Sequence, residues 1–511
     1  MSANVGYWLT HHSENIPNKT AIVYGNLRLT YMQLNNRVNR LSHALLDQGV
    51  RKGDRVNVLL LNTNEFLETL FACAKIGAIF VPINIRLSAP EVDYIVKDSS
   101  SSVFIYDVRL QFIIEELKEK NETHLQFIEV NPGSDRESSP YEKLIGEYPS
   151  SETGFELNAD DYLMLMYTSG TTGKPKGAIL THGNTLANIM NGLYLLPVTA
   201  EDITLTVAPL FHIGGLGIST TQMMYLGGTV VLLDLFTPQS TLEWIEKEKV
   251  STVFMVPSMW QLVMHDSRIE DYDLSSLRLA CSGGAPCPLP VIEYFKGKGI
   301  PFMEGFGMTE TAPIVSILKE EDTIRKIGSV GKPPIHVGVK IVDPTDREVP
   351  IGQVGELAIK GPNVTVGYWN KPEATKEALR SGWFYTGDLA KIDDEGYIYI
   401  VDRKKDMIIS GGENIYPIEV EQVLVRMPNV KEVAVIGIPN EKWGEVIKAY
   451  IVLNSPRQTI KLDDIREYCD GRLARFKMPK EIELLDELPR NATGKVLKRA
   501  LSKPYETEKR V

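Results

Sequence analysis

The chain has 511 residues, of which 43% are hydrophobic, and it carries a formal net charge of −11 with a pI near 5.4. A chain of this length can bury large cores and is long enough for about two to four domains. The acidic balance argues against a nucleic-acid-binding protein, because it implies no basic surface on the scale of a domain. Small anionic substrates would therefore need local basic groups.

The cysteines and the N-terminus bear on the cellular compartment. The cysteines are Cys73, Cys281, Cys287 and Cys469. They form no C-x-x-C pair, so they indicate neither a zinc site nor a disulfide framework, and a reducing cytoplasm fits. The stretch "MSANVGYWLTHHSENIPNK" has no basic region followed by an apolar one, so we expect no signal peptide.

Segment 213–233 lacks charges, but its glycines and hydroxyl residues favour a turn and a buried strand over a membrane span.

The first part of the chain alternates between helix and strand patterns. From Tyr31 to Gly49, leucine and valine recur at helical spacing, and the stretch ends on glycine. "RVNVLLL" and "AIFVPIN" are typical of buried strands, and they flank a helical "EFLETLFACAKIG". Strand, helix and strand in succession predict crossover connections and parallel pairing.

The second part begins near Gly328 with short strands broken by turns, as in "GKPPIHVGVKIVD", "GQVGELAIKG" and "EGYIYIVD". After the charged stretch "DRKKD", we expect a helix around "PIEVEQVLVRM", strands in "VKEVAVIGIP" and "VIKAYIVL", and a helix from about Leu462 to Leu473. These elements are enough for a separate compact α+β domain.

We therefore predict an α/β protein with a large N-terminal domain of mixed, largely parallel sheets and helices, and a small mobile α+β domain at the C-terminus. The predicted boundaries are 1–402 for the first domain, with a β-rich subdomain at about 328–402, then a linker at 403–406 and the second domain at 407–511.

The stretch "YTSGTTGKPKG", residues 167–177, is rich in glycine, hydroxyl residues and lysine. It is no Walker A loop, because Gly170 and Gly173 are too close together and Lys174 is followed by proline. What remains is a turn whose backbone N–H groups and hydroxyls can surround phosphate oxygens, while Lys176 supplies positive charge. On composition alone, a solvated Gly/Thr hairpin fits as well.

Further motifs follow in a fixed order: "SGGAP" at 282–286, "EGFGMTET" at 304–311, "WFYTGDL" at 383–389, "DRKKDMIISGGENIYP" at 402–417 and "PRNATGK" at 489–495. Together with the first motif they resemble the adenylate-forming superfamily of acyl-CoA synthetases, adenylation domains and firefly-type luciferases, over essentially the whole chain. The linker and the "ISGGENIYP" run look most like fatty-acid and related acyl-CoA ligases. The resemblance implies that a carboxylic acid reacts with ATP to give acyl-AMP and pyrophosphate, and that coenzyme A then takes the acyl group.

This chemistry needs cations, because a carboxylate must approach the α-phosphorus of ATP while pyrophosphate leaves. The resemblance assigns Mg²⁺ to Glu310 and Thr168, the α-phosphate to Thr309, and the β- and γ-phosphates to the loop with Lys176. That loop comprises Thr168, Ser169, Gly170, Thr171, Thr172, Gly173 and Lys174. Taken alone, Glu310 would also suit the first turn of a helix, where acidic residues are favoured.

The resemblance also implies an adenine site, formed by Gly283, Gly284, Ala285, Pro286, Glu304, Gly305, Phe306 and Gly307. Phe306 would stack on the base, but it lacks the hydroxyl of the tyrosine that many relatives carry there. Asp388 and Arg403 match residues that bind the ribose hydroxyls. The plain alternatives are that Phe306 belongs to the core and that "TGD" is just a turn.

His212 matches a histidine that borders the acyl and phosphate sites, although a lone histidine in an apolar stretch is usually a satisfied core residue. Residues 213–217 offer no aromatic side chain, which puts an aromatic gate to the acyl tunnel in doubt. Methionines that suit an adaptable acyl pocket, or ordinary core packing, are Met223, Met224, Met255 and Met259.

The family likeness further implies that the C-terminal domain rotates between the two half-reactions, with Lys405 at the hinge. In the first orientation Lys495 would reach the carboxylate and the α-phosphate. In the second, a loop with Gly411, Gly412 and Glu413 would line the tunnel for coenzyme A. Trp443 and the lysines Lys477 and Lys480 would contact the nucleotide of coenzyme A, although such lysines are usually just solvated.

The sequence thus favours a cytoplasmic acyl-CoA ligase that uses ATP, Mg²⁺ and coenzyme A and acts on a medium- or long-chain fatty acid, with chain length controlling turnover. Alternatives are a ligase for aryl or branched acids, an enzyme that loads a carrier protein, and a non-catalytic nucleotide-binding protein. We expect no fused carrier domain, no nucleic-acid partner and no transmembrane span. A homodimer and a peripheral membrane contact stay open.

Overall fold

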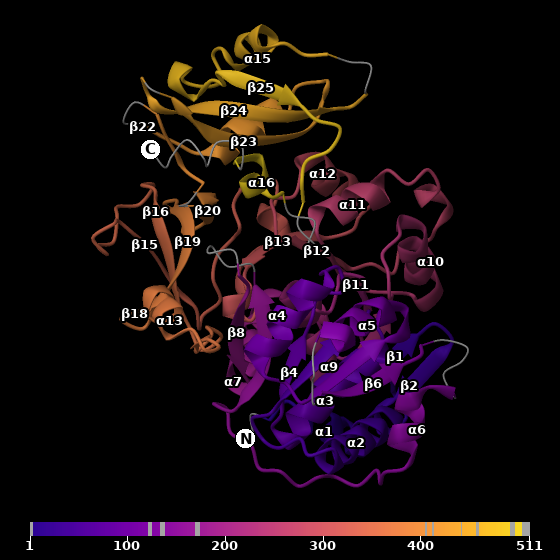
Figure 1. Cartoon of the computed structure of the whole chain (residues 1–511). Helices are drawn as coiled ribbons and strands as arrows, with labels where there is room; N and C mark the ends of the chain where they lie inside the picture. The colour runs from indigo at the N-terminus through magenta and orange to yellow at the C-terminus, as the bar shows by residue number, and fades with distance from the viewer. Residues whose placement is uncertain are drawn as a thin grey trace. The chain divides into compact units, whose positions relative to one another are not determined.

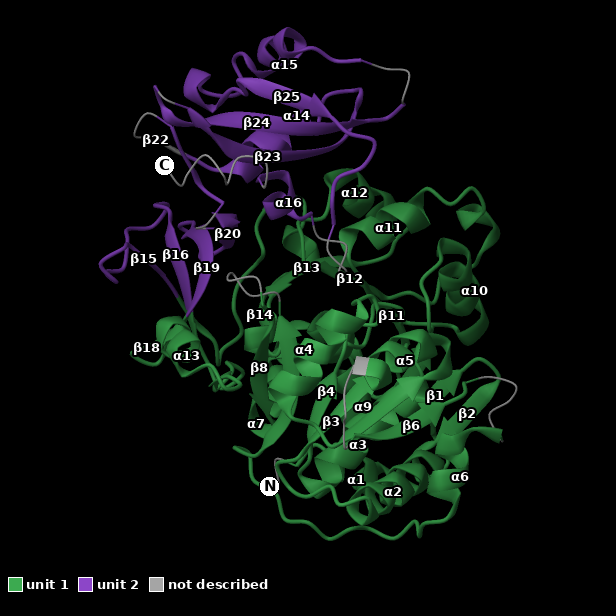
Figure 2. Ribbon diagram, in the orientation of Figure 1, with its two compact units in different colours: residues 1–339, 359–384 green, residues 340–358, 385–511 purple. Residues whose placement is uncertain are grey.

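The computed structural model describes residues 4–120, 125–132, 138–168, 174–403, 406–410, 413–440, 442–455, 459–490 and 496–502. The chain forms two compact units, which Figure 2 shows in green and purple: unit 1 comprises residues 1–339 and 359–384, and unit 2 comprises residues 340–358 and 385–511. The domain boundaries around the linker at 403–406 stay a prediction.

The first sheet of unit 1 has a parallel centre with an antiparallel strand at each edge (Figure 1). Its strands, in spatial order, are β14 (Ile314–Leu318), β13 (Phe302–Gly307), β12 (Leu279–Gly283), β11 (Thr252–Met255), β9 (Ile203–Thr206), β10 (Thr229–Leu232), β1 (Thr20–Tyr24) and β2 (Leu27–Thr30). The carboxyl ends of β12 and β13 carry the "SGGAP" and "EGFGMTET" motifs, so this sheet brings the two motifs side by side.

The second sheet of unit 1 contains the first sequence motif. Its strands, in spatial order, are β17 (Gly367–Tyr368), β8 (Lys176–Thr181), β7 (Tyr162–Thr168), β4 (Ile79–Pro82), β3 (Arg55–Leu59), β5 (Val103–Asp107) and β6 (Gln126–Val130). β3 and β4 are parallel, with α3 between them in the chain, so the predicted crossover is confirmed.

The helices of unit 1 follow the apolar periodicity of the sequence. They are α1 (Tyr7–Asn15), α2 (Tyr31–Asp47), α3 (Asn64–Ile76), α4 (Ala89–Ser99), α5 (Gln111–Lys120), α6 (Pro140–Gly146), α7 (His182–Leu195), α8 (Ile213–Gly215), α9 (Thr221–Leu226), α10 (Pro238–Glu248), α11 (Pro257–Met264), α12 (Leu289–Gly297) and α13 (Pro372–Ala378). α2 starts where its predicted pattern starts, because Thr30 and Gln33 form a reciprocal capping box at its N-terminus.

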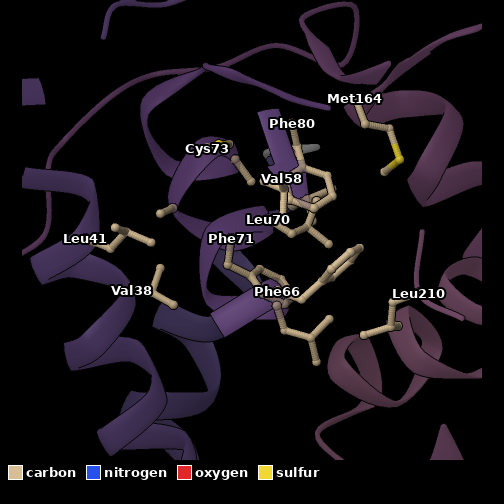
Figure 3. Packing of buried hydrophobic residues seen from close by; sticks show 14 of the residues in the cluster. Val38, Leu41, Val58, Phe66, Leu70, Phe71, Cys73, Phe80, Met164 and Leu210 are labelled. Atoms are coloured by element: carbon tan, nitrogen blue, oxygen red, sulfur yellow. The ribbon is translucent and has the colours of Figure 1, made fainter. Parts of the chain in front are cut away.

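The core of unit 1 is centred on α3, whose residues are all buried. Figure 3 shows Phe66, Leu70 and Phe71 of this helix. They lie between residues of two strands, Val58 and Phe80, and residues of α2, Val38 and Leu41. Each fully buried side chain of this size contributes about 1.5–3 kcal/mol relative to an exposed one. The helix therefore packs against the second sheet, which contains the strands β7 and β8 on either side of the "YTSGTTGKPKG" motif. The four cysteines of the chain are free and buried.

The described residues of unit 2 form mainly two groups of strands and three α-helices. The first group is β15 (Gly338–Val342), β16 (Gly355–Lys360), β19 (Trp383–Ile392) and β20 (Ile398–Arg403). The second is β22 (Glu413–Ile415), β21 (Ile408–Ser410), β24 (Gly444–Leu453), β23 (Val430–Asn440) and β25 (Glu481–Leu484). The helices are α14 (Pro417–Leu424), α15 (Leu462–Cys469) and α16 (Lys498–Ser502).

The fold is mixed α/β, with mixed sheets, helices and a β-rich part, as predicted. Most of the β-rich part groups with unit 2, whereas the sequence analysis assigned it to the first domain. One boundary differs: α15 ends at Cys469 rather than near Leu473, because Gly471 adopts a left-handed conformation with φ of +72°. Among the described residues, no helix is long and apolar enough to cross a membrane. Segment 213–233 instead forms α8, the π-helical turn Leu216–Thr220, α9 and the buried strand β10.

Candidate active site

The glycine-rich motif joins two antiparallel strands of one hairpin. Thr168 at the end of β7 is paired with Lys176 at the start of β8, so the motif begins and ends at one place. Residues of the motif that lie outside the described part of the chain are Ser169, Gly170, Thr171, Thr172 and Gly173. Lys174 and Lys176 follow the turn, and their Nζ atoms lie 5.6 and 5.5 Å from the ring centroids of Tyr94 and Tyr368. The base of the turn therefore carries two cations.

Glu310 lies in a short 3-10 turn, Thr309–Thr311, after β13, and its side chain is buried. The hydroxyl of Tyr368 donates a hydrogen bond of 2.8 Å to its Oε1 atom. Burial and the adjacent charge of Glu310 raise the pKa of Tyr368, which keeps the hydroxyl protonated as a donor. Because Tyr368 is paired with Ala178 of β8, this contact brings the "EGFGMTET" motif to the strand that carries Lys176.

Hydrogen bonds to backbone carbonyl groups hold the Glu310 turn in place. Asn363 donates from Nδ2 to the carbonyl oxygens of Thr311 and Ile314, at 2.7 and 2.9 Å. The N–H of Thr365 donates to the carbonyl of Glu310 at 2.7 Å. Sequence reasoning missed Tyr368 and these supports, although "NVTVGYW" at 363–369 places polar and aromatic residues beside a glycine, as the recognised motifs do.

The residues around Glu310 suit a magnesium ion that is held mainly by a nucleotide. Within the described part of the chain, no cluster of three or more His, Cys, Asp or Glu residues could hold a metal by itself. Mg²⁺ commonly uses one or two carboxylates, and takes its other ligands from phosphate oxygens and water. One buried carboxylate beside the hairpin that is predicted to bind phosphate matches that donor set.

The predicted adenine site lies on β12 and β13. Gly283 is paired with Gly305 on the neighbouring strand, and a Cβ atom at Gly283 would lie 2.9 Å from the carbonyl oxygen of Gly305. A Cβ atom at Gly307 would lie 1.9 Å from the carbonyl oxygen of Pro313. These glycines are thus required by contacts within the protein itself. Gly284 has φ of +83° and turns the chain towards Ala285 and Pro286.

Glu304 and Phe306 lie on the same face of β13, because successive side chains of a strand alternate between its faces. Glu304 is buried, and its Oε1 atom accepts a hydrogen bond of 2.9 Å from the N–H of Cys287. Burial raises the pKa of Glu304 to about 7, and the hydrogen bond opposes this shift. Phe306 is half-buried, so part of its ring is accessible for stacking.

His212 immediately precedes α8, and its Nε2 atom is buried without a hydrogen-bond partner among the described residues. Burial, followed by the nearby charge of Arg86, lowers the pKa of His212 to about 4. The imidazole is therefore neutral at physiological pH. An orphaned buried nitrogen is costly in a folded protein, which argues against a merely satisfied core histidine.

Two predicted ribose ligands meet in unit 2. Asp388 of β19 is paired with Arg403 of β20, and the Arg403 Nε atom lies 3.1 Å from the Asp388 Oδ1 atom. The Asp388 residue is only 3% exposed, whereas its guanidinium partner is partly accessible. The arrangement offers a carboxylate, fixed by an arginine, as a hydrogen-bond acceptor for hydroxyl groups.

The "ISGGENIYP" motif forms the hairpin of β21 and β22, in which Ser410 is paired with Glu413. Ser410 is also paired with Gly444, the first residue of β24, and Trp443 lies in the turn immediately before that strand. Trp443 is 47% exposed, and the Lys442 Nζ atom lies 5.0 Å from its ring centroid. Predicted residues of unit 2 that lie outside the described residues are Lys405, Gly411, Gly412 and Lys495.

Lys477 and Lys480, which lie on either side of Pro479, differ in their surroundings. The Lys477 Nζ atom lies 2.7 Å from the Oε1 atom of Glu419 in α14, so this lysine forms an ion pair within the protein. The N–H of Lys480 donates to the carbonyl of Ile447. Neither contact bears on coenzyme A.

Two family models match the chain. The model described as "AMP-binding enzyme" matches residues 9–369, and the one described as "AMP-binding enzyme C-terminal domain" matches residues 419–495. The first covers the hairpin of β7 and β8 and the Glu310 turn, and the second reaches Lys495. Together they span both units.

Curated relatives match over nearly their full length. A feruloyl-CoA synthase of Amycolatopsis sp is 42% identical, and the match covers 97% of each chain. An indoleacetate–CoA ligase of Aromatoleum aromaticum is 39% identical over 96% of each chain. A long-chain-fatty-acid–CoA ligase of Mycobacterium tuberculosis is 37% identical over 98% of each chain.

Solved structures share the fold. ATP-bound MatB from Rhodopseudomonas palustris has a TM-score of 0.91 at 32% identity, with 99% of each chain covered. An o-succinylbenzoate–CoA synthetase from Bacillus subtilis, in complex with ATP and a magnesium ion, has a TM-score of 0.86 at 34% identity, with 97% of this chain and 99% of that chain covered. The chain belongs to the family of AMP-binding enzymes and is an AMP-forming acyl-CoA ligase that uses ATP, Mg²⁺ and coenzyme A.

Proposed function

We propose that the phosphate hairpin with Lys176 binds the β- and γ-phosphates of ATP, while Glu310 helps to hold Mg²⁺ and Thr309 contacts the α-phosphate. The contact between Tyr368 and Glu310 supports this assignment, because it joins the acidic turn to the strand of Lys176. Lys495 stabilises the negative charge that develops when the carboxylate attacks the α-phosphorus. Asp388, held by Arg403, accepts hydrogen bonds from the ribose.

We further propose that the acid substrate carries an aromatic ring, as arylpropenoic and arylacetic acids do. The observation that carries this proposal is the packing of the segment that follows His212. A Cβ atom at Gly214 would lie 3.3 Å from the ring of Phe254, and one at Gly217 would lie 2.6 Å from Pro313. Segment 213–217, here called the wall, is thus packed against both rings. An acyl site bordered by this wall would suit a short flat group better than a long flexible chain.

Asn188 makes this wall rigid. Its Nδ2 atom donates to the carbonyl of Gly217 at 2.8 Å, and its Oδ1 atom accepts from the N–H of Ile314 at 2.9 Å. The helical segment and the strand after Pro313 are therefore joined by one buried side chain. The feruloyl-CoA synthase and the indoleacetate–CoA ligase, at 42% and 39% identity, point to the same class of acid.

A fatty acid, which the sequence analysis favoured, is the second candidate. It is favoured by an apolar cluster behind the wall and by the relative that acts on long-chain fatty acids. The cluster contains Leu195, Leu196, Ala208, Phe254, Leu279, Cys281, Met303, Ile314 and Ile317. Each methylene buried there would contribute about 0.8 kcal/mol, or about fourfold in kcat/KM.

Pyrophosphate release in the presence and absence of coenzyme A separates the two candidates. We expect ferulate or indoleacetate to exceed every straight-chain acid from hexanoate to palmitate in kcat/KM by at least about tenfold. Phe254→Leu should lower this preference, because it opens the wall beside Gly214. A kcat/KM that rises with each added methylene and exceeds that of every aromatic acid would assign the enzyme to fatty acids.

We also propose that Lys405 is the hinge of a rotation between the half-reactions. Lys405→Pro should slow thioester formation at least about tenfold more than adenylate formation, because proline fixes its own φ and restricts the preceding residue. Lys405→Ala is the matched control, since it removes the same side chain but leaves φ free. Single-turnover kinetics of each half-reaction measure the effect. Equal losses in both half-reactions of Lys405→Pro would contradict the hinge.

A further inference from the structure

A pocket rich in lysine lies beside the hairpin of β7 and β8, and its volume is about 370 Å³. The residues that line it are Tyr94, Asp98, Lys174, Pro175, Lys176 and Lys371. This volume falls in the range of about 300–1,000 Å³ that is usual for small-molecule sites. The three lysines outnumber the one aspartate, so the lining is positively charged. The pocket, here called the lysine pocket, therefore suits an anion.

Helix α4 forms one side of the lysine pocket, and Figure 1 shows this helix beside β8. The hydroxyl of Tyr94 in this helix donates a hydrogen bond of 3.2 Å to the carbonyl of Pro175. The Lys174 Nζ atom lies 5.6 Å from the centroid of the same tyrosine ring. Tyr94 thus contacts both the backbone and the lysine at this edge, which limits the positions that Lys174 can take.

Asp98, one turn after Tyr94 in α4, orients the lysine on the other side. Its Oδ1 atom lies 2.7 Å from the Lys371 Nζ atom, and its Oδ2 atom accepts a hydrogen bond of 2.8 Å from the hydroxyl of Tyr167. The contact with Asp98 raises the pKa of Lys371, so this lysine is charged at physiological pH. A lysine has three N–H donors, so Lys371 keeps donors for an anion while it binds Asp98.

Lys174 and Lys176 bring charge that no carboxylate of the described residues neutralises. Their ammonium groups contact the rings of Tyr94 and Tyr368, and within the described part of the chain neither lysine is in an ion pair. Two cations in one pocket repel each other, and a bound anion relieves this repulsion. The lining therefore favours a ligand with more than one negative charge.

The reaction of an AMP-forming ligase releases such an anion. The carboxylate oxygen forms a bond to the α-phosphorus, the bond from that phosphorus to the bridging oxygen breaks, and pyrophosphate leaves with the electron pair. We infer that the lysine pocket binds this pyrophosphate as it leaves, with Lys174 and Lys371 as the groups that hold it, an inference that rests on the proposed role of Lys176. Lys176 contacts the β- and γ-phosphates before the bond breaks and also lines the pocket that receives them.

The test titrates the full chain in a calorimeter with inorganic pyrophosphate and, separately, with ATP, at a fixed Mg²⁺ concentration and without acid or coenzyme A. In Lys371→Met, the Kd for pyrophosphate should rise about three- to tenfold, as expected when a partly exposed cation is lost. The Kd for ATP should change less than about twofold. Lys371→Arg, which keeps the charge, should bind pyrophosphate within about twofold of the unmodified enzyme.

Asp98→Asn separates the effect of charge from that of structure. Asparagine has the same shape and can still accept the hydrogen bond from Tyr167, but it removes the negative charge of the lining. The Kd for pyrophosphate should therefore fall about two- to fivefold in Asp98→Asn, in the opposite direction to Lys371→Met. An ion pair that only stabilised the fold would give losses of the same sign in both variants.

Lys376→Met is the matched control. Lys376 is an exposed lysine of α13, the helix that begins next to Lys371, and it does not line the pocket. Its removal should change the Kd for pyrophosphate less than about twofold. Lys174→Met is the second variant in case Lys371→Met does not fold, and it should weaken pyrophosphate binding by the same factor.

The inference is overturned if Lys371→Met binds pyrophosphate normally, if Asp98→Asn also weakens binding, or if the Kd for ATP rises as much as that for pyrophosphate in Lys371→Met. Lys176→Met distinguishes this failure from failure of the proposed function. A normal Kd for ATP and a normal adenylation rate in Lys176→Met would remove the role of Lys176 itself. A loss there, with normal pyrophosphate binding in Lys371→Met, would remove only the pyrophosphate site.

Discussion

Replacing Lys495 by alanine is expected to slow adenylation by at least about 100- to 1000-fold, which is the loss seen when a stabiliser of developing negative charge is removed. The reason is that two anions, the carboxylate and the α-phosphate, must meet in the transition state. Without Lys495, their repulsion would be opposed by the cations that we propose for the phosphates, Mg²⁺ and Lys176. Supplying preformed acyl-adenylate should bypass the defect, so that coenzyme A is acylated at a near-normal rate.

Single-turnover kinetics of the two half-reactions measure this difference, and circular dichroism confirms that the variant is folded. Lys503→Ala is a suitable control, because this lysine lies close to Lys495 in the sequence but outside the motif. If Lys495 were an ordinary surface lysine near the C-terminus, its removal would change little. Adenylation near the normal rate, or an equal loss in both half-reactions, would exclude the proposed role.

The sequence was sufficient for features that depend on local patterns. The helix from Tyr31 and the parallel strands around α3 follow from apolar periodicity, which local sequence displays directly. The meeting of Asp388 and Arg403 follows from the resemblance, because both residues stand in recognised motifs on paired strands. The hairpin at Thr168 and Lys176 likewise agrees with the turn chemistry of the motif.

Other features depend on contacts between distant segments, which no local pattern displays. Tyr368 reaches Glu310 only because β17 is added to the edge of β8. The sequence suggests that Gly283 and Gly305 make room for adenine, whereas in the structure a Cβ atom at Gly283 would also meet the carbonyl of Gly305, and one at Gly305 the side chain of Ile317. The sequence left two interpretations of His212, a site residue or a satisfied core residue. It could not decide between them because the burial of His212 results from tertiary packing.

Glu310→Gln is expected to weaken the binding of Mg²⁺, so that adenylation slows by about 100- to 1000-fold at low Mg²⁺ concentration. A unit charge about 4 Å from a cation gains roughly 4 kcal/mol at an effective dielectric constant of about 20. Glutamine has the same shape and can still accept the hydrogen bond from Tyr368, so the substitution removes the charge and little else. Raising the Mg²⁺ concentration should therefore recover part of the lost rate.

Tyr368→Phe is the matched comparison. It keeps the ring near Lys176 and the charge of Glu310, but it removes the hydroxyl that donates a hydrogen bond to Glu310. A hydrogen bond to a charged group is worth about 1.5–3 kcal/mol, so this variant should lose about 10- to 100-fold. Its loss should depend little on Mg²⁺ concentration, since the carboxylate that attracts the metal is retained. The measurement is the adenylation rate of both variants across a Mg²⁺ titration. A Glu310→Gln variant with the same Mg²⁺ dependence as the unmodified enzyme would show that Glu310 is a structural acid of the turn and no metal ligand.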